Sequence, residues 1–458
     1  MTTHLTTRFI AEAMRDQGYA VHEGPATEVT GGSFDSRRVR PGDLFTAFHG
    51  EHVDGNQFVG EALAGGAVAA ICERAPEPIP PGATVVVAPD ATRATGALAH
   101  AWRKACNPRV VGITGTVGKT TAKDITAAAL SSRFATHRSP GNLNSREGLP
   151  LALMSLRRDH EVSVLEMGMD SPGEIAELCA IAEPDVGVVL NIGLTHVSKL
   201  GSAEAIEAEK LSLVRWLPAT GTAVVNVDDP RIAPAVPGLR ARVLSFGKAG
   251  AAVLRCGTVV DRGLEGTSFE VTYAGEPRQV DCHIPGEHVV PGALAAMAVC
   301  LALGMTLREA STAVGAAEVE GRVHVLASDT GATILDDSYN SSPASLAGAL
   351  RMLGRLQGRR VALIGRMAEL GDYEAEEHRR IGEVAAETCD SLVAVGESCR
   401  VTVETARALG LGDATWFADK DEAAAAVRSR LKSGDFVLVK ASRSQAFETI
   451  LPVLEGAL

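Results

Sequence analysis

A glycine-rich segment that also carries two lysines and four threonines, GITGTVGKTTAKD at residues 112–124, follows directly after the apolar stretch RVV. A strand, a glycine-rich turn and a helix that opens at Lys119 form the usual context for a phosphate-binding loop. The spacing is unusual, because the general pattern places four residues between its first glycine and Gly-Lys-Thr, and that first position is Ile113 here. We still expect a nucleotide site rather than a simple turn between a strand and a helix.

The chemistry of this loop would be the binding of the β- and γ-phosphates. Backbone N–H groups can surround the phosphate oxygens, Lys119 supplies positive charge, and the hydroxyl of Thr120 can face a magnesium ion. The loop residues that we expect at the nucleotide are Gly115, Thr116, Val117, Gly118, Lys119, Thr120 and Thr121.

Two further polar residues follow apolar runs that are typical of strands. Glu166 ends VSVLE and His196 lies just past VVLNI, and ligands collect at the carboxyl ends of parallel strands. Both residues can complete the coordination of magnesium beside Thr120. The alternative for Glu166 is a carboxylate bonded to a neighbouring N–H group, and His196 taken alone is better explained as a loop histidine in water. Lys210, taken alone, favours a surface ion pair with Glu207.

The length and composition suggest a protein of several domains. A chain of 458 residues with 46% hydrophobic and only 4% aromatic residues predicts an α/β protein of about three domains. A formal charge of −12 argues against nucleic acid or an anionic membrane as the main partner. Eight scattered cysteines, no secretion signal and no apolar run long enough to span a membrane predict a cytoplasmic protein.

The order of strand and helix signals divides the chain. We expect an N-terminal domain over residues 1–88, with a helix over 56–74 and a strand in TVVV. Residues 89–318 begin with a helix and then alternate strands and helices, which predicts a parallel sheet covered on both faces. The pattern restarts in residues 319–458, where we expect a second, Rossmann-like sheet.

Matches along nearly the whole chain then resemble one family, the Mur ligases. The shortened loop Thr-Gly-Thr-x-Gly-Lys-Thr is similar to the phosphate loop of that family. The other segments that resemble it are FDSRRVRPGDLFTAFHGEHVDGNQFVGEAL, SPGNLNSREGLPLAL, VLEMGMDSPGEIAEL, PDVGVVLNIGLTHV, LDDSYNSSPASLAGAL, GRMAELGDYEAEEH and VLVKASRSQAFE.

The resemblance implies a fold and an activity. It implies an N-terminal domain for a uridine nucleotide, a central domain for ATP, and a C-terminal domain for an amino acid or dipeptide. The best-matching branch of the family adds D-Ala-D-Ala to UDP-MurNAc-tripeptide in peptidoglycan precursor synthesis, by ATP-dependent amide formation through an acyl phosphate. The resemblance also implies one or two Mg²⁺ ions, and we expect a monomer.

The resemblance assigns roles to individual residues. Lys210 would be carbamoylated by CO₂ and so bind a second magnesium ion. The implied catalytic residues are Lys119, Lys210, His196 and Arg322, and the implied metal ligands are Thr120, Glu166, His196 and Lys210. Outside the loop, the ATP contacts would be His288, Arg322 and Asp337. The contacts to the other substrates would be Ser33, Asp35, Ser36, Arg37, Asn142, Asn144, Asn340 and Arg443.

The chain also departs from the pattern of the family. Gly292 stands in place of an asparagine expected at the adenine, Ser342 replaces an asparagine, Arg366 an aspartate and Ala441 a glycine. These changes leave open a related ligase that joins a different amino acid or peptide. The competing interpretations are a folylpolyglutamate synthase, a GTPase or motor ATPase, and a non-catalytic nucleotide-sugar binder. The loop sequence, the NVDD segment, and the retained Lys119, Glu166, His196 and Lys210 weigh against them.

Overall fold

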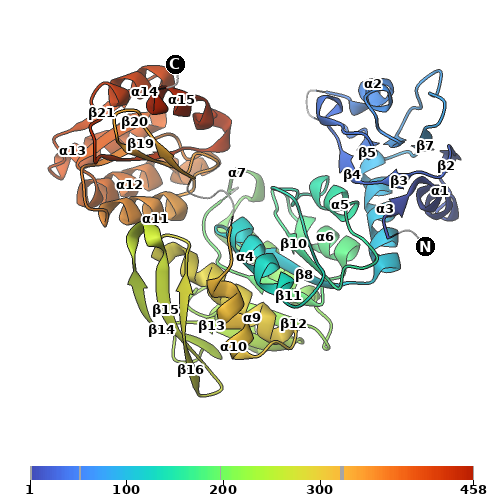
Figure 1. The fold of residues 1–458 in the computed structure, drawn as a ribbon, viewed down its shortest axis with the longest axis horizontal. Helices are drawn as coiled ribbons and strands as arrows, with labels where there is room; N and C mark the ends of the chain where they lie inside the picture. Colours follow the sequence, from blue (N-terminus) through green and yellow to red (C-terminus); the bar gives the residue numbers. More distant parts are fainter. Residues whose placement is uncertain (1–2, 51–52, 196, 320–323, 457–458) are drawn as a thin grey trace.

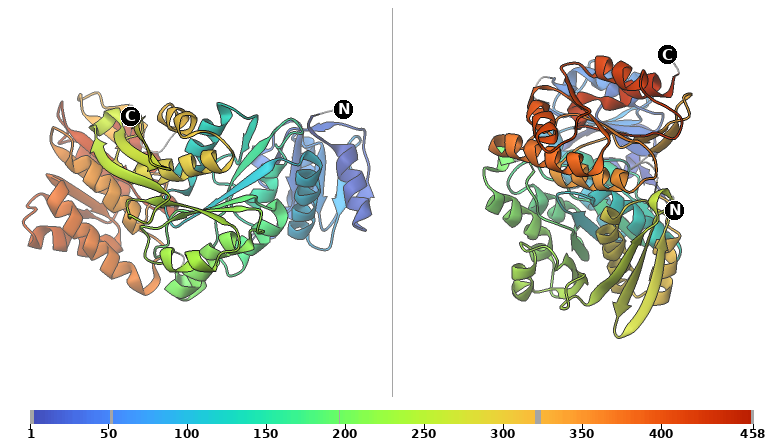
Figure 2. Two further views of the ribbon diagram at one scale, coloured as in Figure 1. Left: turned by 90° about the horizontal axis from the view of Figure 1, so that it is seen from below. Right: turned by 90° about the vertical axis from the view of Figure 1, so that its left-hand side faces the viewer.

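The structure is a computed structural model that describes residues 3–50, 53–195, 197–319 and 324–456. The predicted site residues His196 and Arg322 lie outside the described residues. Three α/β units lie in a row in chain order, each built on its own sheet (Figures 1 and 2). The predicted fold class is confirmed, whereas the boundaries at residues 88 and 318 stay predictions. No helix in the described part of the chain is both long and apolar enough to cross a membrane.

The N-terminal unit holds a five-stranded sheet of order β2-β7-β6-β5-β4. The predicted helix over residues 56–74 is wrong in its second half. Helix α2 ends at Ala64, Gly66 takes a φ of 115° that suits glycine, and the apolar run AAIC then enters the sheet as a buried strand. The elements of the N-terminal unit are β1 (Leu5–Thr6), α1 (Thr7–Asp16), β2 (Ala20–His22), β3 (Glu28–Val29), β4 (Gly31–Ser33), β5 (Asp43–Thr46), α2 (Val59–Ala64), β6 (Ala69–Cys72) and β7 (Thr84–Val87).

Helix α3 (Ala91–Cys106) joins this unit to the next one, as the sequence predicts. The side chain of Asp90 caps its first turn by accepting from the N–H of Arg93. Its apolar face, which includes Leu98 and Trp102, packs in one core with residues of both units. The indole N–H of Trp102 donates to the carbonyl of Leu156 at 2.9 Å. The first two units are therefore joined by a shared core and not only by the chain.

The central unit has a nine-stranded sheet of order β16-β15-β14-β13-β12-β11-β8-β10-β9. Neighbouring strands pair in parallel from β9 to β14, and β14, β15 and β16 then form an antiparallel meander. Helices α3, α5, α6 and α8 cover one face of the parallel part, and α4, α9 and α10 cover the other. The strands are β8 (Arg109–Thr114), β9 (Thr136–Arg138), β10 (Val162–Glu166), β11 (Val186–Val189), β12 (Thr222–Asn226), β13 (Arg242–Gly247), β14 (Leu254–Asp261), β15 (Thr267–Tyr273) and β16 (Glu276–Cys282). The helices are α4 (Lys119–Ser131), α5 (Gly148–Leu153), α6 (Glu174–Ala182), α7 (Val197–Leu200), α8 (Ala203–Trp216), α9 (Val290–Ala302) and α10 (Leu307–Gly315).

The C-terminal unit has a six-stranded sheet of order β17-β18-β22-β19-β20-β21, parallel except at β17. Helices α11, α12 and α13 pack on one face, and α14 and α15 on the other. The strands are β17 (His324–Ala327), β18 (Thr333–Asp336), β19 (Arg360–Ile364), β20 (Ser391–Val395), β21 (Ala414–Phe417) and β22 (Phe436–Lys440). The helices are α11 (Pro343–Gly354), α12 (Glu374–Thr388), α13 (Arg400–Ala408), α14 (Lys420–Arg428) and α15 (Leu451–Glu455).

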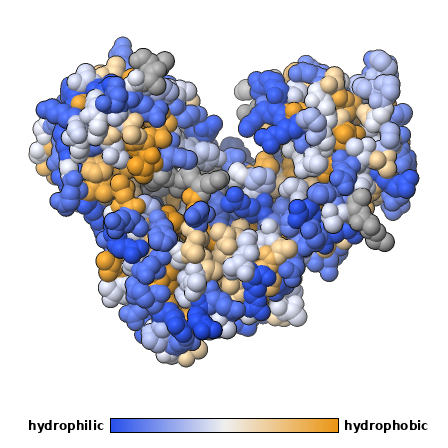
Figure 3. Space-filling view, viewed as in Figure 1, coloured by the Kyte–Doolittle hydropathy of each residue, from blue (hydrophilic) through white to orange (hydrophobic). Residues whose placement is uncertain are grey.

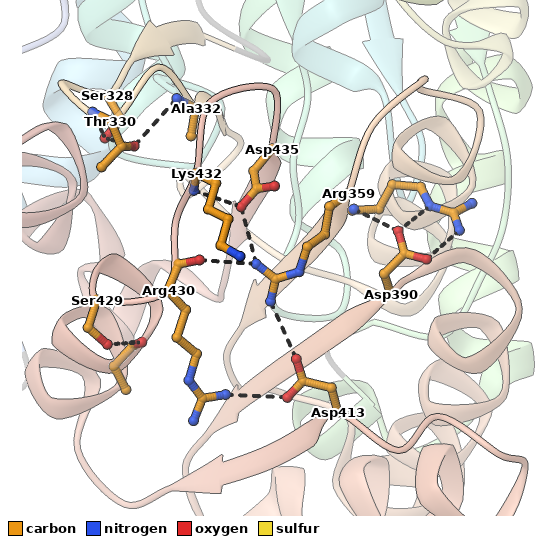
Figure 4. Close-up of polar contacts among 12 residues, drawn as sticks. Ser328, Thr330, Ala332, Arg359, Asp390, Asp413, Ser429, Arg430, Lys432 and Asp435 are labelled. Carbon is orange, nitrogen blue, oxygen red and sulfur yellow. Dashed lines mark hydrogen bonds and ion pairs between the residues drawn. The ribbon is translucent and has the colours of Figure 1, made fainter.

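Charged side chains gather at the amino ends of the C-terminal strands (Figure 4). Arg359 donates to Asp435 at 3.1 Å and to Asp413 at 3.4 Å, and Asp435 is only 4% exposed. Arg430 reaches Asp413 from the other side. Parallel strands place this network at the edge of the sheet opposite to their carboxyl ends, so we expect it to support the fold rather than the chemistry.

We expect Arg359→Met to lower the free energy of unfolding by about 1–3 kcal/mol, because the buried carboxylate of Asp435 loses its charged partner. Arg430→Met is the matched control, because its pair with Asp413 is exposed and should contribute less than about 1 kcal/mol. Denaturant unfolding measures both variants. Equal, small losses for the two variants would contradict this account.

Candidate active site

The glycine-rich loop lies between the end of β8 at Thr114 and the start of α4 at Lys119, as predicted. Gly118 precedes the helix with a φ of 79°, which a residue with a Cβ adopts only at a cost. The side-chain amide of Asn191 fixes the loop from the neighbouring strand. Its oxygen accepts from the N–H groups of Thr116 and Val117 at 3.0 and 2.9 Å, and its amide donates to the carbonyl of Val117. The loop is therefore preorganised for a ligand.

Lys119 is folded over this loop. Its Nζ donates to the carbonyl of Gly115 at 3.0 Å and to that of Thr116 at 3.4 Å. The first N–H groups of a helix have no partner within the helix and carry partial positive charge. The amino end of α4 and the ammonium of Lys119 thus face the same place, where an anion would be stabilised.

The carboxylate of Glu166 lies beside the hydroxyl of Thr120, the second predicted magnesium ligand. Thr120 donates to Glu166 at 2.7 Å, and the amide of Asn144 donates to the other carboxylate oxygen at 2.7 Å. Both partners are side chains, so the simpler explanation of Glu166, a bond to a neighbouring backbone N–H, does not describe its carboxylate. No cluster of three or more His, Cys, Asp or Glu suited to a metal occurs within the described ranges, which exclude His196.

Lys210 is buried beneath the loop, and the surface ion pair with Glu207 is wrong. The residue is 2% exposed, and its Nζ donates to the carbonyl of Gly115 at 3.1 Å. Glu207 lies 3.9 Å from Arg231 instead. Burial, with a further contribution from the charge of Lys119, lowers the pKa of Lys210 well below its ordinary value. A neutral amine, which is the form that reacts with CO₂, is therefore favoured here.

The buried amine predicts an unusual dependence of stability on pH. The unfolded chain holds Lys210 with its ordinary pKa of 10.5, so unfolding below that pH takes up a proton and is favoured. Stability should rise with pH in this window. We expect Lys210→Met to be more stable than the wild type at neutral pH, with a difference that shrinks toward pH 10.5. Thermal unfolding in CO₂-free buffer tests this, with the exposed Lys104→Met as control. A destabilised Lys210→Met variant whose deficit is constant with pH would contradict it.

A cleft between the central and C-terminal units runs past the loop and has a volume of about 420 Å³. In the space-filling view the N- and C-terminal units stand on either side of a hollow above the central unit (Figure 3). The central unit lines this interdomain cleft with the 116–120 loop, Asn142, Asn144, Ser145, Glu166, Gly168, Met169, Asp170, Glu174, Leu194, Thr195 and Lys210. The C-terminal unit contributes Tyr339, Asn340, Ser341, Ser342, Ser345, Ala368, Glu369, Leu370, Ser442, Arg443 and Ser444.

A second cavity of about 590 Å³ adjoins the cleft at Val117 and Gly118. His288 and Asp337, two predicted ATP contacts, line this side cavity. Its size and partly apolar walls suit a bound small molecule. The loop thus has a large cavity on each side, one that can hold a nucleoside and one that can hold the reacting groups.

The carboxyl ends of β18 and β22 lie in the wall that the C-terminal unit contributes to the interdomain cleft and to the side cavity. Lys440 is 2% exposed and lies 2.7 Å from the carboxylate of Asp337, and its Nζ also donates to the carbonyl of Asn340 at 2.7 Å. Asp336 accepts the N–H of Ser338, so the Asx-type turn that the composition suggests is present. Arg443 pairs with Glu448 at 2.7 Å while it lines the cleft.

The N-terminal residues predicted to hold the uridine nucleotide form a separate, self-contained turn. Ser33 accepts the N–H of Asp35, and Asp35 and Arg37 form an ion pair at 2.9 Å. None of Ser33, Asp35, Ser36 and Arg37 lines the interdomain cleft or the side cavity. The turn follows β4, which packs against α5 through Gly32 and Leu151. It therefore lies one short helix away from the segment that carries Asn142 and Asn144.

Four residues depart from the pattern of the family, and the structure shows where each of them lies. Gly292 lines the side cavity, and a Cβ there would lie 3.6 Å from Ala122 of α4. Ser342 caps α11, with its N–H bonded to Ser345. Arg366 is held in a two-bond pair with Glu374 at 2.6 and 2.7 Å, so its side chain does not line the cleft. Ala441 is buried.

Two residues that position the site are not found by sequence reasoning. Asn191 lies just past β11, and Lys440 ends the strand FVLVK. A lysine that closes an otherwise apolar, buried strand is a usable signal, because such a charge needs a partner. The role of Asn191 depends on the pairing of β11 with β8, which the sequence does not display.

Models of three domains of one family match the chain in order. They are the Mur ligase family catalytic domain at residues 28–104, the Mur ligase middle domain at 113–300 and the Mur ligase glutamate ligase domain at 321–443. Together with the relatives below, they show that the chain belongs to the Mur ligase family. It is an enzyme of the ATP-dependent ligase class.

Two curated relatives and two solved structures illustrate the similarity over nearly the whole chain. The UDP-N-acetylmuramoyl-tripeptide--D-alanyl-D-alanine ligase of Treponema pallidum is 36% identical, and that of Bacillus subtilis 31%, each over 93% of both chains. The crystal structure of MurF from Acinetobacter baumannii has a TM-score of 0.86 at 28% identity over 99% of both chains. MurF from Thermotoga maritima in complex with ADP has a TM-score of 0.79 at 30% identity, over 93% of this chain and 97% of that one.

Proposed function

We propose that this enzyme joins D-Ala-D-Ala to UDP-MurNAc-tripeptide at the expense of ATP, in the synthesis of peptidoglycan precursors. The observation that carries the proposal is the interdomain cleft, where the phosphate loop, Glu166 and Lys210 face a wall that contains Asn340 and Arg443. The substrates are inferred from the names of the relatives. The cleft is large enough for the reacting groups and is lined by the residues that would bind them.

Amide formation from a carboxylate needs activation, because hydroxide is a poor leaving group. A carboxylate oxygen of the tripeptide attacks the γ-phosphorus of ATP, and ADP leaves. The amine of the dipeptide then attacks the carbonyl of this acyl phosphate, and inorganic phosphate leaves with the bridging oxygen. Several anionic oxygens meet in these steps, and their repulsion is severe in a site of low dielectric.

The chain supplies positive charge and fixed geometry for these steps. Lys119 and the amino end of α4 face the β- and γ-phosphates, and the bonds from Asn191 hold the loop in shape. His288 and Asp337 border the nucleoside in the side cavity. Preorganised positive charge of this kind supplies most of the rate in phosphoryl transfer. We also propose His196 and Arg322 as catalytic residues, together with Lys119 and Lys210.

Magnesium fits the oxygen ligands on the rim of the loop. The hydroxyl of Thr120 and the carboxylate of Glu166 are the hard donors that Mg²⁺ prefers, and His196 is the proposed third ligand. When bound, Mg²⁺ would neutralise phosphate charge. The buried Lys210 is the proposed site of carbamoylation, since its neutral amine can take up CO₂ and become an acceptor for a second ion.

The two other substrates enter from opposite sides. The uridine diphosphate would bind at Ser33, Asp35, Ser36 and Arg37, and the attached peptide would run along α5 toward Asn142 and Asn144. The dipeptide would bind the C-terminal wall near Asn340 and Arg443. One chain supplies all of these positions, so we propose that the enzyme works as a monomer. The eight cysteines are free and buried, which supports a cytoplasmic location.

Phosphate release measured with purified enzyme, ATP and UDP-MurNAc-tripeptide tests this function. A panel of amino acids and dipeptides supplies the amine. We expect D-Ala-D-Ala to stimulate the release of phosphate and the other amines to leave it unchanged. Release that requires a different amine would instead indicate a related ligase with another substrate.

A further inference from the structure

The loop after β19 carries an unusual backbone conformation at Glu369. Its φ is 65°, in the left-handed region that residues with a Cβ seldom adopt. The residue is exposed and lines the interdomain cleft. Conformations of this kind persist where the surroundings impose them, and they cluster at functional sites.

Hydrogen bonds on the amino side of Glu369 hold this loop in place. The N–H of Gly365 donates to the carbonyl of Lys440 at 2.9 Å, that of Met367 to His378 at 3.2 Å, and that of Ala368 to the hydroxyl of Ser442 at 2.8 Å. Burial lowers the pKa of His378 to about 4, so its neutral ring can accept the bond. The position of Glu369 is thus set by the fold.

Glu369 and Arg443 project from adjacent points on the wall. Each directly follows one partner of the Ala368–Ser442 hydrogen bond, at the ends of the neighbouring strands β19 and β22. Among the described residues that the C-terminal unit contributes to the cleft, these two are the charged ones, with opposite signs. A free dipeptide carries the same complement, one ammonium and one carboxylate.

The other carboxylates that line the cleft, those of Glu166, Asp170 and Glu174, belong to the central unit. Glu166 binds Thr120 and Asn144, Glu174 accepts the N–H groups of Arg146 and Asp170, and Asp170 pairs with Lys199. Glu369 is the carboxylate that the C-terminal unit itself contributes to the described lining of the cleft.

We propose that Glu369 receives the ammonium of the incoming dipeptide while Arg443 receives its carboxylate. This inference rests on the proposed function and deepens it, because it makes Glu369 a specificity-determining residue for a zwitterionic amine. The pair would fix the direction in which the dipeptide lies in the interdomain cleft.

Steady-state kinetics of Glu369→Gln tests the assignment. The KM for D-Ala-D-Ala should rise about 10–100-fold, as expected when one partner of a charge pair is lost, while the KM values for ATP and UDP-MurNAc-tripeptide stay within about twofold. N-acetyl-D-Ala-D-Ala, which lacks the ammonium, should inhibit wild type and variant equally. Asp372→Asn, which removes a like charge from the same loop outside the cleft, is the matched control and should change none of these values.

Glu369→Gly separates this role from folding. Glycine adopts a φ of 65° readily, so the melting temperature should be kept while the KM for the dipeptide rises as in Glu369→Gln. An unchanged KM for the dipeptide, or an equal rise for all three substrates, would overturn the role of Glu369 alone. A wild type that ignores D-Ala-D-Ala would instead overturn the proposed function.

Discussion

Replacing Lys119 by alanine is expected to lower the rate of ATP-dependent phosphate release by about 10²–10³-fold. Its ammonium is held over the phosphate loop by the carbonyls of Gly115 and Thr116, so it is in place before charge develops on the γ-phosphate. Steady-state and single-turnover assays with saturating substrates measure the loss.

The matched control is Lys104→Ala, which removes an exposed lysine of α3 that pairs with Glu183. It should keep the wild-type rate. A Lys119→Ala variant that forms product at the wild-type rate would remove the loop from the chemistry.

Lys210→Ala should lose about 100-fold in rate and regain activity when a short-chain carboxylic acid is added. The substitution leaves room next to Gly115 where Lys210 lies buried, and an added carboxylate can replace the proposed carbamate as an acceptor for magnesium. Activity is measured against a series of acids of increasing size, because only small ones fit the space.

The same acids should not restore Lys119→Ala, since that variant lacks a positive charge and not an acceptor. Depletion of CO₂ and bicarbonate should also slow the wild type and leave the rescued Lys210→Ala variant unaffected. A Lys210→Ala variant as active as the wild type would end the carbamate proposal.

The sequence predicts the central and C-terminal folds well because their signals are local. Strand β8 and the start of α4 at Lys119 follow from an apolar run, glycines and helix-forming residues. The N-terminal unit is less predictable. The apolar AAIC run reads as the end of a helix, since a short buried strand cannot be distinguished from a helix end by periodicity.

The candidate site is only partly predictable from single residues. Lys210 on its own predicts a surface ion pair, because the sequence does not show that α8 buries this position under the loop. The burial of Lys210 in the structure corrects that interpretation, and the role that the resemblance implies for this residue stays a proposal. Glu369 lies in a segment that resembles the family, GRMAELGDYEAEEH, but the sequence alone does not single it out. Its left-handed backbone cannot be predicted, because the preceding residues Met367 and Ala368 are held by His378 and Ser442 on other elements.

The central claim is that the tripeptide carboxylate is phosphorylated before nitrogen attacks it. Incubation of the enzyme with ATP, D-Ala-D-Ala and UDP-MurNAc-tripeptide labelled with ¹⁸O in its terminal carboxylate tests this directly. Mass analysis of the inorganic phosphate should find one ¹⁸O atom per phosphate, carried over from the bridging oxygen of the acyl phosphate. Unlabelled phosphate, or label recovered in AMP, would contradict the account.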